Sequence, residues 1–272
     1  MVCQPWTPLY NEFLLTRSQR DRLQVVLVSP RNPLNIGAAA RAMANFGFSQ
    51  LAVVAPYEEH WREAKSAIGA EELLHSARKT EALSDSVADC TLVAGTGTLA
   101  HRKPEQPVVS LPAFTSIVQT EIARGGRIAL VFGQEKHGLT REDLALCHVL
   151  VEIPTDPRQP SMNLGQAVAV CLYELASQRD RADVPNENPT AAATRSIGAP
   201  ATARDLDLLA EMVDKTMAAA NYSPSAMRKA NLHDLHLMLR RMVHTRQDAK
   251  RVLGLFRRIV WRLEQRTGSA HE

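Results

Sequence analysis

The sequence of 272 residues has few aromatic side chains, few cysteines and no long apolar run, and each scarcity excludes a class of protein. Aromatic residues make up 5% of the chain, so a hydrophobic core must consist mainly of Ala, Val, Leu and Ile. The four cysteines lie far apart, which argues against a disulfide framework or a zinc site. No apolar run approaches the roughly 20 residues of a membrane span, and residues 1–24 lack a signal-peptide pattern. We therefore expect a cytoplasmic protein without a metal or a membrane partner.

Positive charge gathers near the C-terminus, although the whole chain carries a net charge of only +3. Residues 227–266 contain eleven Lys or Arg and three Asp or Glu, whereas the rest of the chain holds 21 basic and 26 acidic residues. Such asymmetry is typical of a polyanion-binding element joined to a less basic body. A solvated helix face would have the same composition, so charge alone leaves both interpretations open.

Short apolar runs alternate with helical patterns over residues 22–179. The runs lie at residues 25–28, 51–54, 91–94, 128–132 and 149–153. Most are apolar throughout, as expected of strands that are covered on both faces. Between them the pattern predicts helices, including one over residues 36–46 that stops at Gly47. The predicted fold class is α/β, with a parallel sheet flanked by helices.

The composition changes after this region. Residues 180–204 are rich in Ala, Pro, Asn and Thr and poor in large apolar residues, which is typical of a linker. Residues 205–220 and 227–266 repeat apolar residues at three- and four-residue steps, which predicts helices. The predicted domains are an N-terminal arm (1–21), an α/β domain (22–179), a linker (180–204) and a basic all-α extension (205–272).

Two loops that follow predicted strands could carry chemistry, because ligands of open α/β sheets bind beyond the carboxyl ends of the strands. Residues 29–41 lead from a strand into a helix, whose free N–H groups could meet an anion. An ordinary turn would explain the same residues, with Asn35 as the helix cap and Arg41 on a solvated face. Residues 95–98 read Gly-Thr-Gly-Thr, which is weak evidence without a full dinucleotide-binding fingerprint.

Two further loops are rich in glycine or proline. Residues 131–140 place Glu135, Lys136 and His137 between two glycines, although a glycine turn before a capped helix would look similar. Residues 153–164 contain three prolines that stiffen the loop. Asn163 stands at capping distance from Gln166, so capping alone could account for it. No G-x-S-x-G elbow surrounds Ser161, which argues against a serine hydrolase.

Three of these segments, in this order, resemble the three motifs of the SpoU/TrmH branch of the SPOUT methyltransferases. They read Asn-Ile-Gly-Ala-Ala-Ala-Arg at 35–41, Phe-Gly-Gln-Glu-Lys-His-Gly-Leu at 132–139, and Ile-Pro followed by Ser-Met-Asn-Leu within 153–164. The resemblance covers about residues 22–178. It implies methylation of ribose 2′-hydroxyls in RNA with S-adenosyl-L-methionine as cofactor. It also implies a deep trefoil knot in the C-terminal part of the sheet domain, and a homodimer in which two chains complete the active site.

The resemblance also implies roles for single residues. The cofactor contacts would be Thr96, Gly97, Thr98, Gly133, Ile153, Pro160, Ser161, Met162 and Leu164. The catalytic polar residues would be Asn35, Arg41, Glu135, Ser161 and Asn163. The family assigns activation of the hydroxyl to the arginine that matches Arg41, but a guanidinium has five donors and no acceptor. We therefore expect Arg41 to position phosphate and hydroxyl first, while Glu135 and His137 are more ordinary bases.

The basic tail is similar to the C-terminal extension of TrmJ-type tRNA methyltransferases, which points to position 32 of the tRNA anticodon loop. Its predicted phosphate contacts are Arg240, Arg241, Arg257 and Arg258. One alternative is the same chemistry on ribosomal RNA or at another tRNA position. Another is a non-catalytic RNA- or DNA-binding protein, whose binding would be salt-sensitive and weakly specific. A nicotinamide dehydrogenase would need a G-x-G-x-x-G fingerprint, which the first loop lacks.

Overall fold

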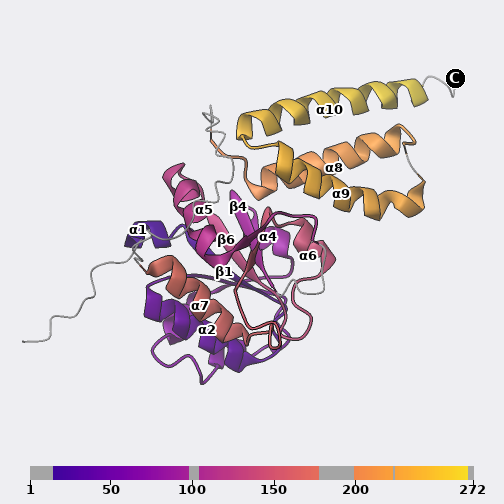
Figure 1. Ribbon diagram of the computed structural model, residues 1–272. Helices are drawn as coiled ribbons and strands as arrows, with labels where there is room; N and C mark the ends of the chain where they lie inside the picture. Colours follow the sequence, from indigo (N-terminus) through magenta and orange to yellow (C-terminus); the bar gives the residue numbers. More distant parts are fainter. Residues whose placement is uncertain (1–14, 98–103, 178–198, 223, 269–272) are drawn as a thin grey trace, which may run out of the picture.

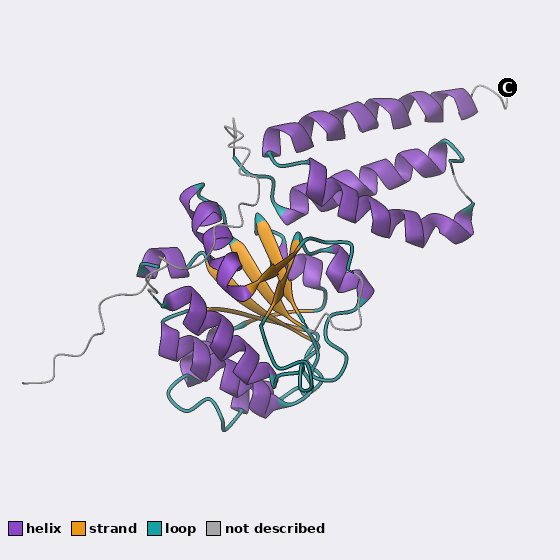
Figure 2. Ribbon diagram, viewed as in Figure 1, coloured by secondary structure: helices purple, strands orange, loops and turns teal. Residues whose placement is uncertain are grey.

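A computed structural model describes residues 15–97, 104–177, 199–222 and 224–268, which form an α/β body and a bundle of C-terminal helices (Figures 1 and 2). The bundle lies at one side of the body, with its last helix farthest from the sheet. None of the described helices is both long enough and apolar enough to cross a lipid bilayer.

Within the described residues, one sheet of seven parallel strands has the order β3-β2-β1-β6-β4-β7-β5. The strands are β1 (Leu23–Val28), β2 (Gln50–Val54), β3 (Arg78–Thr80), β4 (Leu92–Thr96), β5 (Val108–Ser110), β6 (Ile128–Phe132) and β7 (Val149–Glu152). The parallel sheet is confirmed, as are the five predicted strands. The sequence missed β3 and β5, which are three-residue strands at the two edges of the sheet.

Each face of the sheet has its own hydrophobic core. In β1, Val25 and Leu27 belong to one core and Val26 and Val28 to the other, because successive side chains of a strand point to opposite faces. The first core is covered by α2 (Pro33–Phe46), α5 (Leu111–Ala123) and α7 (Leu164–Ala176). The second is covered by α4 (Leu83–Val87), α6 (Arg141–Ala145) and the start of α8 (Ala203–Ala219). Short helices occur at α1 (Arg17–Arg20), η1 (Trp61–Glu63), α3 (Glu71–Ser76) and η2 (Ser225–Met227).

Helix α2 begins three residues before its predicted start. Asn32 caps it, since the Asn32 side chain accepts a hydrogen bond from the backbone N–H of Leu34, and Pro33 occupies the first turn. The interpretation of Asn35 as the cap is therefore wrong, and its side chain is available for other contacts. Gly47 ends the helix in the left-handed conformation (φ +71°), as predicted.

The N-terminal arm was predicted to extend to residue 21, but the chain joins the core earlier. Leu15 is 2% exposed and belongs to the first core. Thr16 caps α1 through a capping box with Gln19. Residues 1–14 of the predicted arm lie outside the described residues.

The C-terminal helices are α8, α9 (Arg228–Met242) and α10 (Arg246–Gly268). The helix predicted over residues 227–266 is thus two helices, separated at residues 243–245, where Thr245 accepts a hydrogen bond from the backbone N–H of Asp248. The helices share a small core that includes Leu209, Val213, Leu235 and Leu239. Most of the predicted linker lies outside the described residues, but its last residues already pack on the body.

Candidate active site

A cavity of about 540 Å³ opens beyond the carboxyl ends of β4, β6 and β7. This size is typical of small-molecule sites, and the carboxyl edge of the sheet is where ligands of α/β proteins bind. The predicted cofactor contacts that line the cavity are Thr96, Gly97, Gly133, Ile153, Pro160, Ser161, Met162 and Leu164. Thr98, the remaining one, lies outside the described residues. The structure therefore brings residues from three separate loops into one wall.

Two glycines let the backbone form part of this wall. A Cβ atom at Gly133 would lie 2.1 Å from the carbonyl carbon of Gly138 and 2.2 Å from the nitrogen of Leu139. The 133–139 loop can therefore fold back on itself only with glycine at position 133. No atom of the described residues lies within 4 Å of a Cβ atom placed at Gly97, so these residues leave the backbone there open to a ligand.

Three polar residues of the predicted site are joined by hydrogen bonds. The amide of Asn35 donates to the Glu135 carboxylate at 3.0 Å, and the amide of Asn163 donates to Asn35 Oδ1 at 2.9 Å. Asn163 also caps α7, because its Oδ1 accepts from the backbone of Gly165 at 2.9 Å. Capping thus accounts only for the Oδ1 atom of Asn163. The Nδ2 atom, through Asn35 and Glu135, connects the segments that follow β1, β6 and β7.

The Glu135 carboxylate is held in its ionised form. Burial would raise its pKa, but hydrogen bonds from the Asn35 side chain and from the backbone of Arg31 and Asn32 outweigh this effect and lower the pKa below its ordinary value. Both backbone bonds are 3.1 Å long. A carboxylate that already accepts three hydrogen bonds and resists protonation is an anchor for the loops rather than a general base.

The other predicted catalytic residues are divided between two places. Ser161 is exposed on the cavity wall, and His137 lines the cavity as well. Arg41 is exposed on α2, does not line the cavity, and makes no hydrogen bond or ion pair with a described residue. Within one chain, the predicted arginine therefore stands apart from the pocket that it would serve.

The structure corrects the expectation for Arg240. Its side chain is 1% exposed, and its guanidinium donates to the Asp207 carboxylate at 2.8 Å and to the backbone oxygen of Leu146 at 3.1 Å. It also approaches His236 Nδ1 at 3.0 Å. Arg240 thus joins α9 to α8 and to the body, and it is not available for a phosphate contact. The sequence could not show this, because Asp207 lies 33 residues away along the chain.

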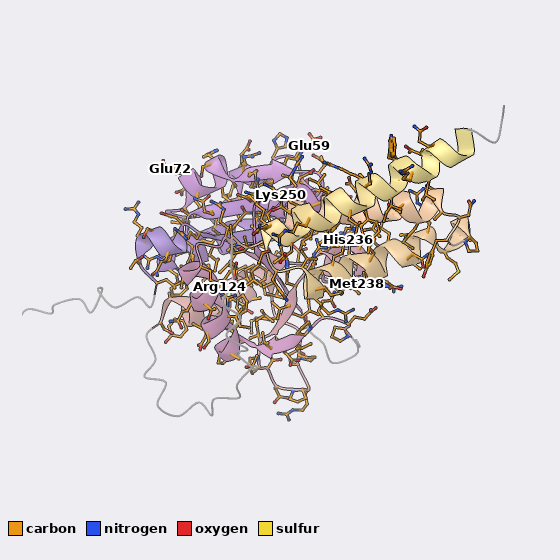
Figure 3. All side chains as sticks on the ribbon, turned by 90° about the horizontal axis from the view of Figure 1, so that it is seen from above. Glu59, Glu72, Arg124, His236, Met238 and Lys250 are labelled. Atoms are coloured by element: carbon orange, nitrogen blue, oxygen red, sulfur yellow. The ribbon has the colours of Figure 1, made fainter. Side chains whose placement is uncertain are left out.

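The other three predicted phosphate contacts lie on the surface. Arg241, Arg257 and Arg258 are exposed, and none pairs with a carboxylate among the described residues. Seen from above, α10 is the outermost helix of the bundle (Figure 3). Trp261 on α10 is 45% exposed and lies between Arg258 and Arg262, whose guanidinium carbons are 4.9 and 5.3 Å from the ring centroid. Sequence reasoning missed this aromatic group, although its spacing from Arg258 was visible.

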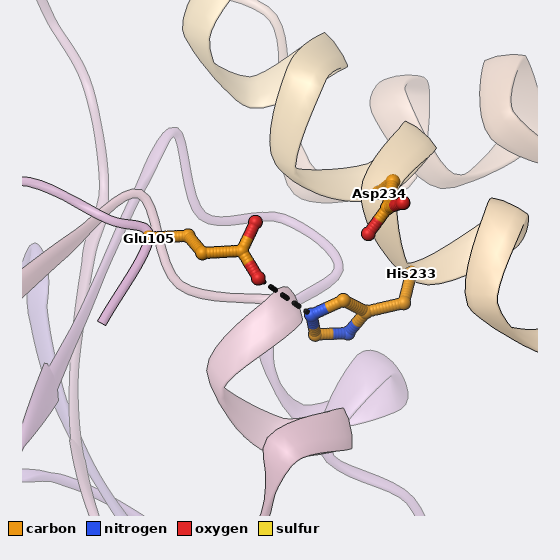
Figure 4. Close-up of side chains that lie close together, drawn as sticks. All are labelled: Glu105, His233 and Asp234. Carbon is orange, nitrogen blue, oxygen red and sulfur yellow. Dashed lines mark ion pairs between the residues drawn. The ribbon is translucent and has the colours of Figure 1, made fainter. Parts of the chain in front are cut away.

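One cluster at the junction of body and bundle combines metal-ligand residue types. Ligand atoms of Glu105, His233 and Asp234 all lie within 4.8 Å of one another (Figure 4). However, the guanidinium of Arg141 donates to His233 Nε2 at 3.2 Å and lies 3.9 Å from Glu105. The positive charge of Arg141 already occupies this place, so the cluster is a polar contact between α9 and the body. Lys229 and Glu142 add a further pair at 2.8 Å.

Strained backbone marks two neighbouring strand ends at the same edge of the sheet. Ser29 follows β1 with φ +48°, and Ala55 follows β2 with φ +42°, although neither is a glycine. Such conformations cost about 1–3 kcal/mol each and concentrate at functional sites. Ser29 lies directly before the loop that donates hydrogen bonds to Glu135, and Ala55 lies directly before the loop that contacts it through Tyr57.

Known proteins share these features. A family model described as the SpoU rRNA Methylase family matches residues 22–173. The tRNA (cytidine/uridine/adenosine-2′-O-)-methyltransferase TrmJ of Pseudomonas aeruginosa is 40% identical over 156 residues, which are 57% of this chain and 60% of that protein. The tRNA (cytidine-2′-O-)-methyltransferase TrmJ of Methanocaldococcus jannaschii is 34% identical over 161 residues, which are 58% of this chain and 69% of that protein.

A solved structure extends the likeness to the C-terminal helices. The crystal structure of TrmJ from Z. mobilis ZM4 superposes with a TM-score of 0.74 and 25% identity, over 87% of this chain and 98% of that one. The matched region spans less than two thirds of the first curated relatives, 60% and 63% of their lengths. Because the family model covers more than half of the chain, the chain belongs to the SpoU rRNA methylase family.

Proposed function

We propose that this chain transfers a methyl group from S-adenosyl-L-methionine to a ribose 2′-hydroxyl of tRNA. The observation that carries the proposal is the convergence of three motif loops, joined through Glu135, Asn35 and Asn163, on one cavity. The tRNA 2′-O-methyltransferases among its relatives favour tRNA over ribosomal RNA. The similarity of the tail to TrmJ-type enzymes favours position 32 of the anticodon loop.

The cavity fits S-adenosyl-L-methionine in size and chemistry. Leu139, Leu144 and Leu150 offer apolar surface to an adenine ring, and the exposed backbone at Gly97 can hydrogen-bond to it. The carboxylate of Glu152 places negative charge on the wall, which complements a cationic ligand. When bound, the cofactor supplies an electrophilic methyl group to an attacking oxygen. The chain's part is to hold the ribose in front of it.

Positioning is the main task of the polar residues. Holding reacting groups in a near-attack geometry can contribute roughly 7 to 11 kcal/mol to lowering a barrier. The amides of Asn35 and Asn163 are fixed by hydrogen bonds, so they can orient the ribose without first being ordered. The Ser161 hydroxyl lies on the wall to hydrogen-bond the bound ligands. Arg41, which can only donate, positions the phosphate and the hydroxyl oxygen.

A homodimer would complete this site. Arg41 lies outside the cavity of its own chain, so a second copy would have to supply it. Helix α2, which carries Arg41, and helix α7, which Asn163 caps, also expose Leu34 (54%), Val170 (37%) and Tyr173 (49%). We propose that two chains pair through this apolar face. Sedimentation of the wild type as a dimer and of Val170→Asp as an inactive monomer would support the pairing, whereas an active monomer would contradict it.

The trefoil knot and the cytoplasmic location belong to the same proposal. The knot rests on the family resemblance, and it is compatible with a sheet in which β6 lies between β1 and β4. A knotted chain must thread a loop, so we expect refolding from denaturant to be slow compared with an unknotted sheet of this size. The cytoplasm follows from the proposed tRNA substrate.

The C-terminal helices would bind the RNA backbone. Arg241, Arg257 and Arg258 present positive charge to solvent, and Trp261 adds an aromatic surface between two arginines. Phosphate contacts of this kind supply affinity with little sequence preference. The bundle would therefore bind the tRNA, while the loops of the body would determine which ribose is methylated.

The test is methylation of unmodified tRNA by the purified protein with S-adenosyl-L-methionine. Digestion to nucleosides and mass spectrometry should reveal a 2′-O-methylnucleoside, and partial digestion should place it at position 32. Arg41→Ala should abolish transfer while cofactor binding, measured by calorimetry, stays at the wild-type value. Loss of cofactor binding in Arg41→Ala would reject the positioning role of this residue.

The remaining outcomes separate the alternatives. Product on ribosomal RNA but not on tRNA would correct the substrate and keep the chemistry. Cofactor binding without transfer to either RNA would show that the substrate is wrong. RNA binding without measurable cofactor affinity would favour a non-catalytic binding protein, because such a protein has no reason to hold S-adenosyl-L-methionine.

A further inference from the structure

One exposed tyrosine, Tyr57, lies near the hydrogen-bonded residues Asn35, Glu135 and Asn163 and has no role in the proposed methyl transfer. Tyr57, in the loop after β2, is 71% exposed and does not line the cavity. The guanidinium carbon of Arg31, in the loop after β1, lies 5.4 Å from the centroid of its ring. An aromatic ring with an arginine over one face is a combination that RNA-binding proteins use to stack bases.

The pair is fixed relative to the candidate active site. The backbone N–H of Tyr57 donates to the Pro30 oxygen at 3.1 Å, which ties the two loops together. The backbone N–H of Arg31 donates to the Glu135 carboxylate at 3.1 Å, and Glu135 lines the cavity. A continuous series of contacts therefore connects the tyrosine to the pocket wall. The backbone that carries the ring is therefore already ordered before a ligand binds.

The backbone is strained where both loops leave the sheet. Ser29 lies two residues before Arg31, and Ala55 lies two residues before Tyr57; both have positive φ. The backbone of Ser29 donates to the oxygen of Val54 at 2.8 Å, so the two strained segments are also neighbours in space. Two unfavourable conformations at adjacent strand ends turn both loops toward each other. Because strained backbone concentrates at functional sites, it suggests a functional role for Arg31 and Tyr57, which these two loops bring together.

The charged residues next to Tyr57 indicate which part of an RNA would bind there. Glu58 and Glu59, which follow Tyr57, are exposed, and Figure 3 shows Glu59 at the edge of the body. These carboxylates would repel a phosphate group that approached the ring from their side. An uncharged nucleobase avoids this repulsion and still gains stacking with Tyr57. The surroundings thus favour a base over the RNA backbone.

We propose that Tyr57, together with Arg31, forms a stacking site for an unpaired base within one nucleotide of the methylated ribose. The inference rests on the proposed function, because it places this base beside the reacting sugar. Stacking on an aromatic side chain requires a base that is free of its helix, which single-stranded loops provide. The site would therefore contribute to a preference for loop nucleotides over paired ones.

Kinetics with a minimal stem–loop RNA test the site. Tyr57→Ala should lower kcat/KM for the RNA by about tenfold, the size of effect expected from loss of one base stack. Tyr57→Phe keeps the ring and should stay within about twofold of the wild type. Cofactor affinity should not change in either variant, because Tyr57 lies outside the cavity wall.

Fluorescence tests the stacking directly and does not depend on turnover. In the same RNA, 2-aminopurine replaces one base at a time at the target position and at its two neighbours. Wild type and Tyr57→Phe should quench one of these probes on binding, and Tyr57→Ala should leave it unquenched. Equal quenching by Tyr57→Ala and wild type, or an unchanged kcat/KM in Tyr57→Ala, would overturn the inference. Absence of methyl transfer by the wild type would instead overturn the proposed function, and the quenching would still decide whether Tyr57 stacks a base.

Discussion

The α/β body and the C-terminal bundle use charged residues in opposite ways. In the body, the wall of the cavity is largely glycine, proline and apolar, and the carboxylate of Glu135 accepts hydrogen bonds from Arg31, Asn32 and Asn35. In the bundle, basic residues dominate, but they are not equivalent. Arg240 is internal and paired with Asp207, whereas Arg241 beside it is exposed.

The difference shows that the number of charges in a segment does not reveal their role. What decides is whether a carboxylate and a set of backbone acceptors lie within reach of the side chain. Arg240 meets both and holds the two regions together. Arg241, Arg257 and Arg258 meet neither among the described residues, so they remain available to a polyanion.

The largest expected effect comes from substituting Arg240, which tests the difference between an internal and an exposed arginine. Arg240→Ala would take the buried guanidinium away from the Asp207 carboxylate, which is itself 17% exposed, so we expect the free energy of unfolding to fall by about 3 kcal/mol. Arg241→Ala, one residue later and exposed, should change it by no more than about 0.5 kcal/mol. Urea denaturation of both variants checks this. Equal effects of the two substitutions would contradict the assignment of Arg240 as internal.

The glycine that shapes the cavity can be tested in the body. Gly133→Ala places a methyl group against the backbone of Gly138 and Leu139, so we expect a loss of stability of about 3 kcal/mol. Cofactor affinity should fall by more than about tenfold, because the displaced loop forms part of the wall. Thermal unfolding and calorimetric titration with S-adenosyl-L-methionine measure the two effects. A variant with wild-type affinity would show that this loop does not form the cofactor site.

The junction between the two regions should be sensitive to acid. Burial lowers the pKa of His148 to about 3, and the positive charge of Arg240 acts in the same direction. An unfolded histidine titrates near about pH 6.5. Between about pH 6.5 and 3, His148 therefore binds a proton in the unfolded chain but not in the folded chain. Stability should therefore be complete above this window and should decrease by about 1.4 kcal/mol for each pH unit below 6.5.

Urea titrations at pH 7.5 and 5.5 measure this dependence. The imidazole Nδ1 of His148 accepts a hydrogen bond from the backbone of Val93, so His148→Leu lowers stability at both values. The same substitution should flatten the slope between them. An unchanged slope in His148→Leu would assign the acid sensitivity to another group.

The smallest predicted effect is a gain in the bundle. Gly254 lies within α10, and a Cβ atom there would meet no other atom within 4 Å in the part of the chain that the structure describes. Gly254→Ala should therefore raise the stability of the bundle by about 1 kcal/mol through helix propensity alone. Thermal unfolding detects it, and comparison with Gly133→Ala separates a glycine required by packing from one that is not. A loss of stability would mean that this side of α10 is covered.

Much of the fold was predictable because its signals are local. The apolar runs of β1, β2, β4, β6 and β7 are buried on both faces, and such strands need no alternating pattern. Gly47 and Thr140 mark helix ends by their own conformation and side chain. Strands β3 and β5 gave no such signal, because three polar or mixed residues at a sheet edge resemble a loop. The break between α9 and α10 was hidden because the apolar stripe continues through it.

The site was predictable only through resemblance. Asn35 and Glu135 stand 100 residues apart, and Asn35 and Asn163 stand 128 apart, so no spacing rule could join them. The motif order placed them in one site, and the structure shows the hydrogen bonds that hold them there. Tyr57 had no motif around it, and its relation to Arg31 emerges only when the ends of β1 and β2 are seen side by side.

The division of work between body and bundle is tested most directly by tRNA affinity measured as a function of salt concentration. The wild type is compared with the triple variant Arg241→Ala, Arg257→Ala and Arg258→Ala, and cofactor affinity is measured alongside. Each lost phosphate contact should reduce the salt slope by about 0.7–0.9, so three contacts should reduce it by about 2 to 3. The account predicts this loss with unchanged cofactor affinity. A triple variant with wild-type RNA affinity and salt slope would contradict it, because the basic helices would then be only a solvated surface.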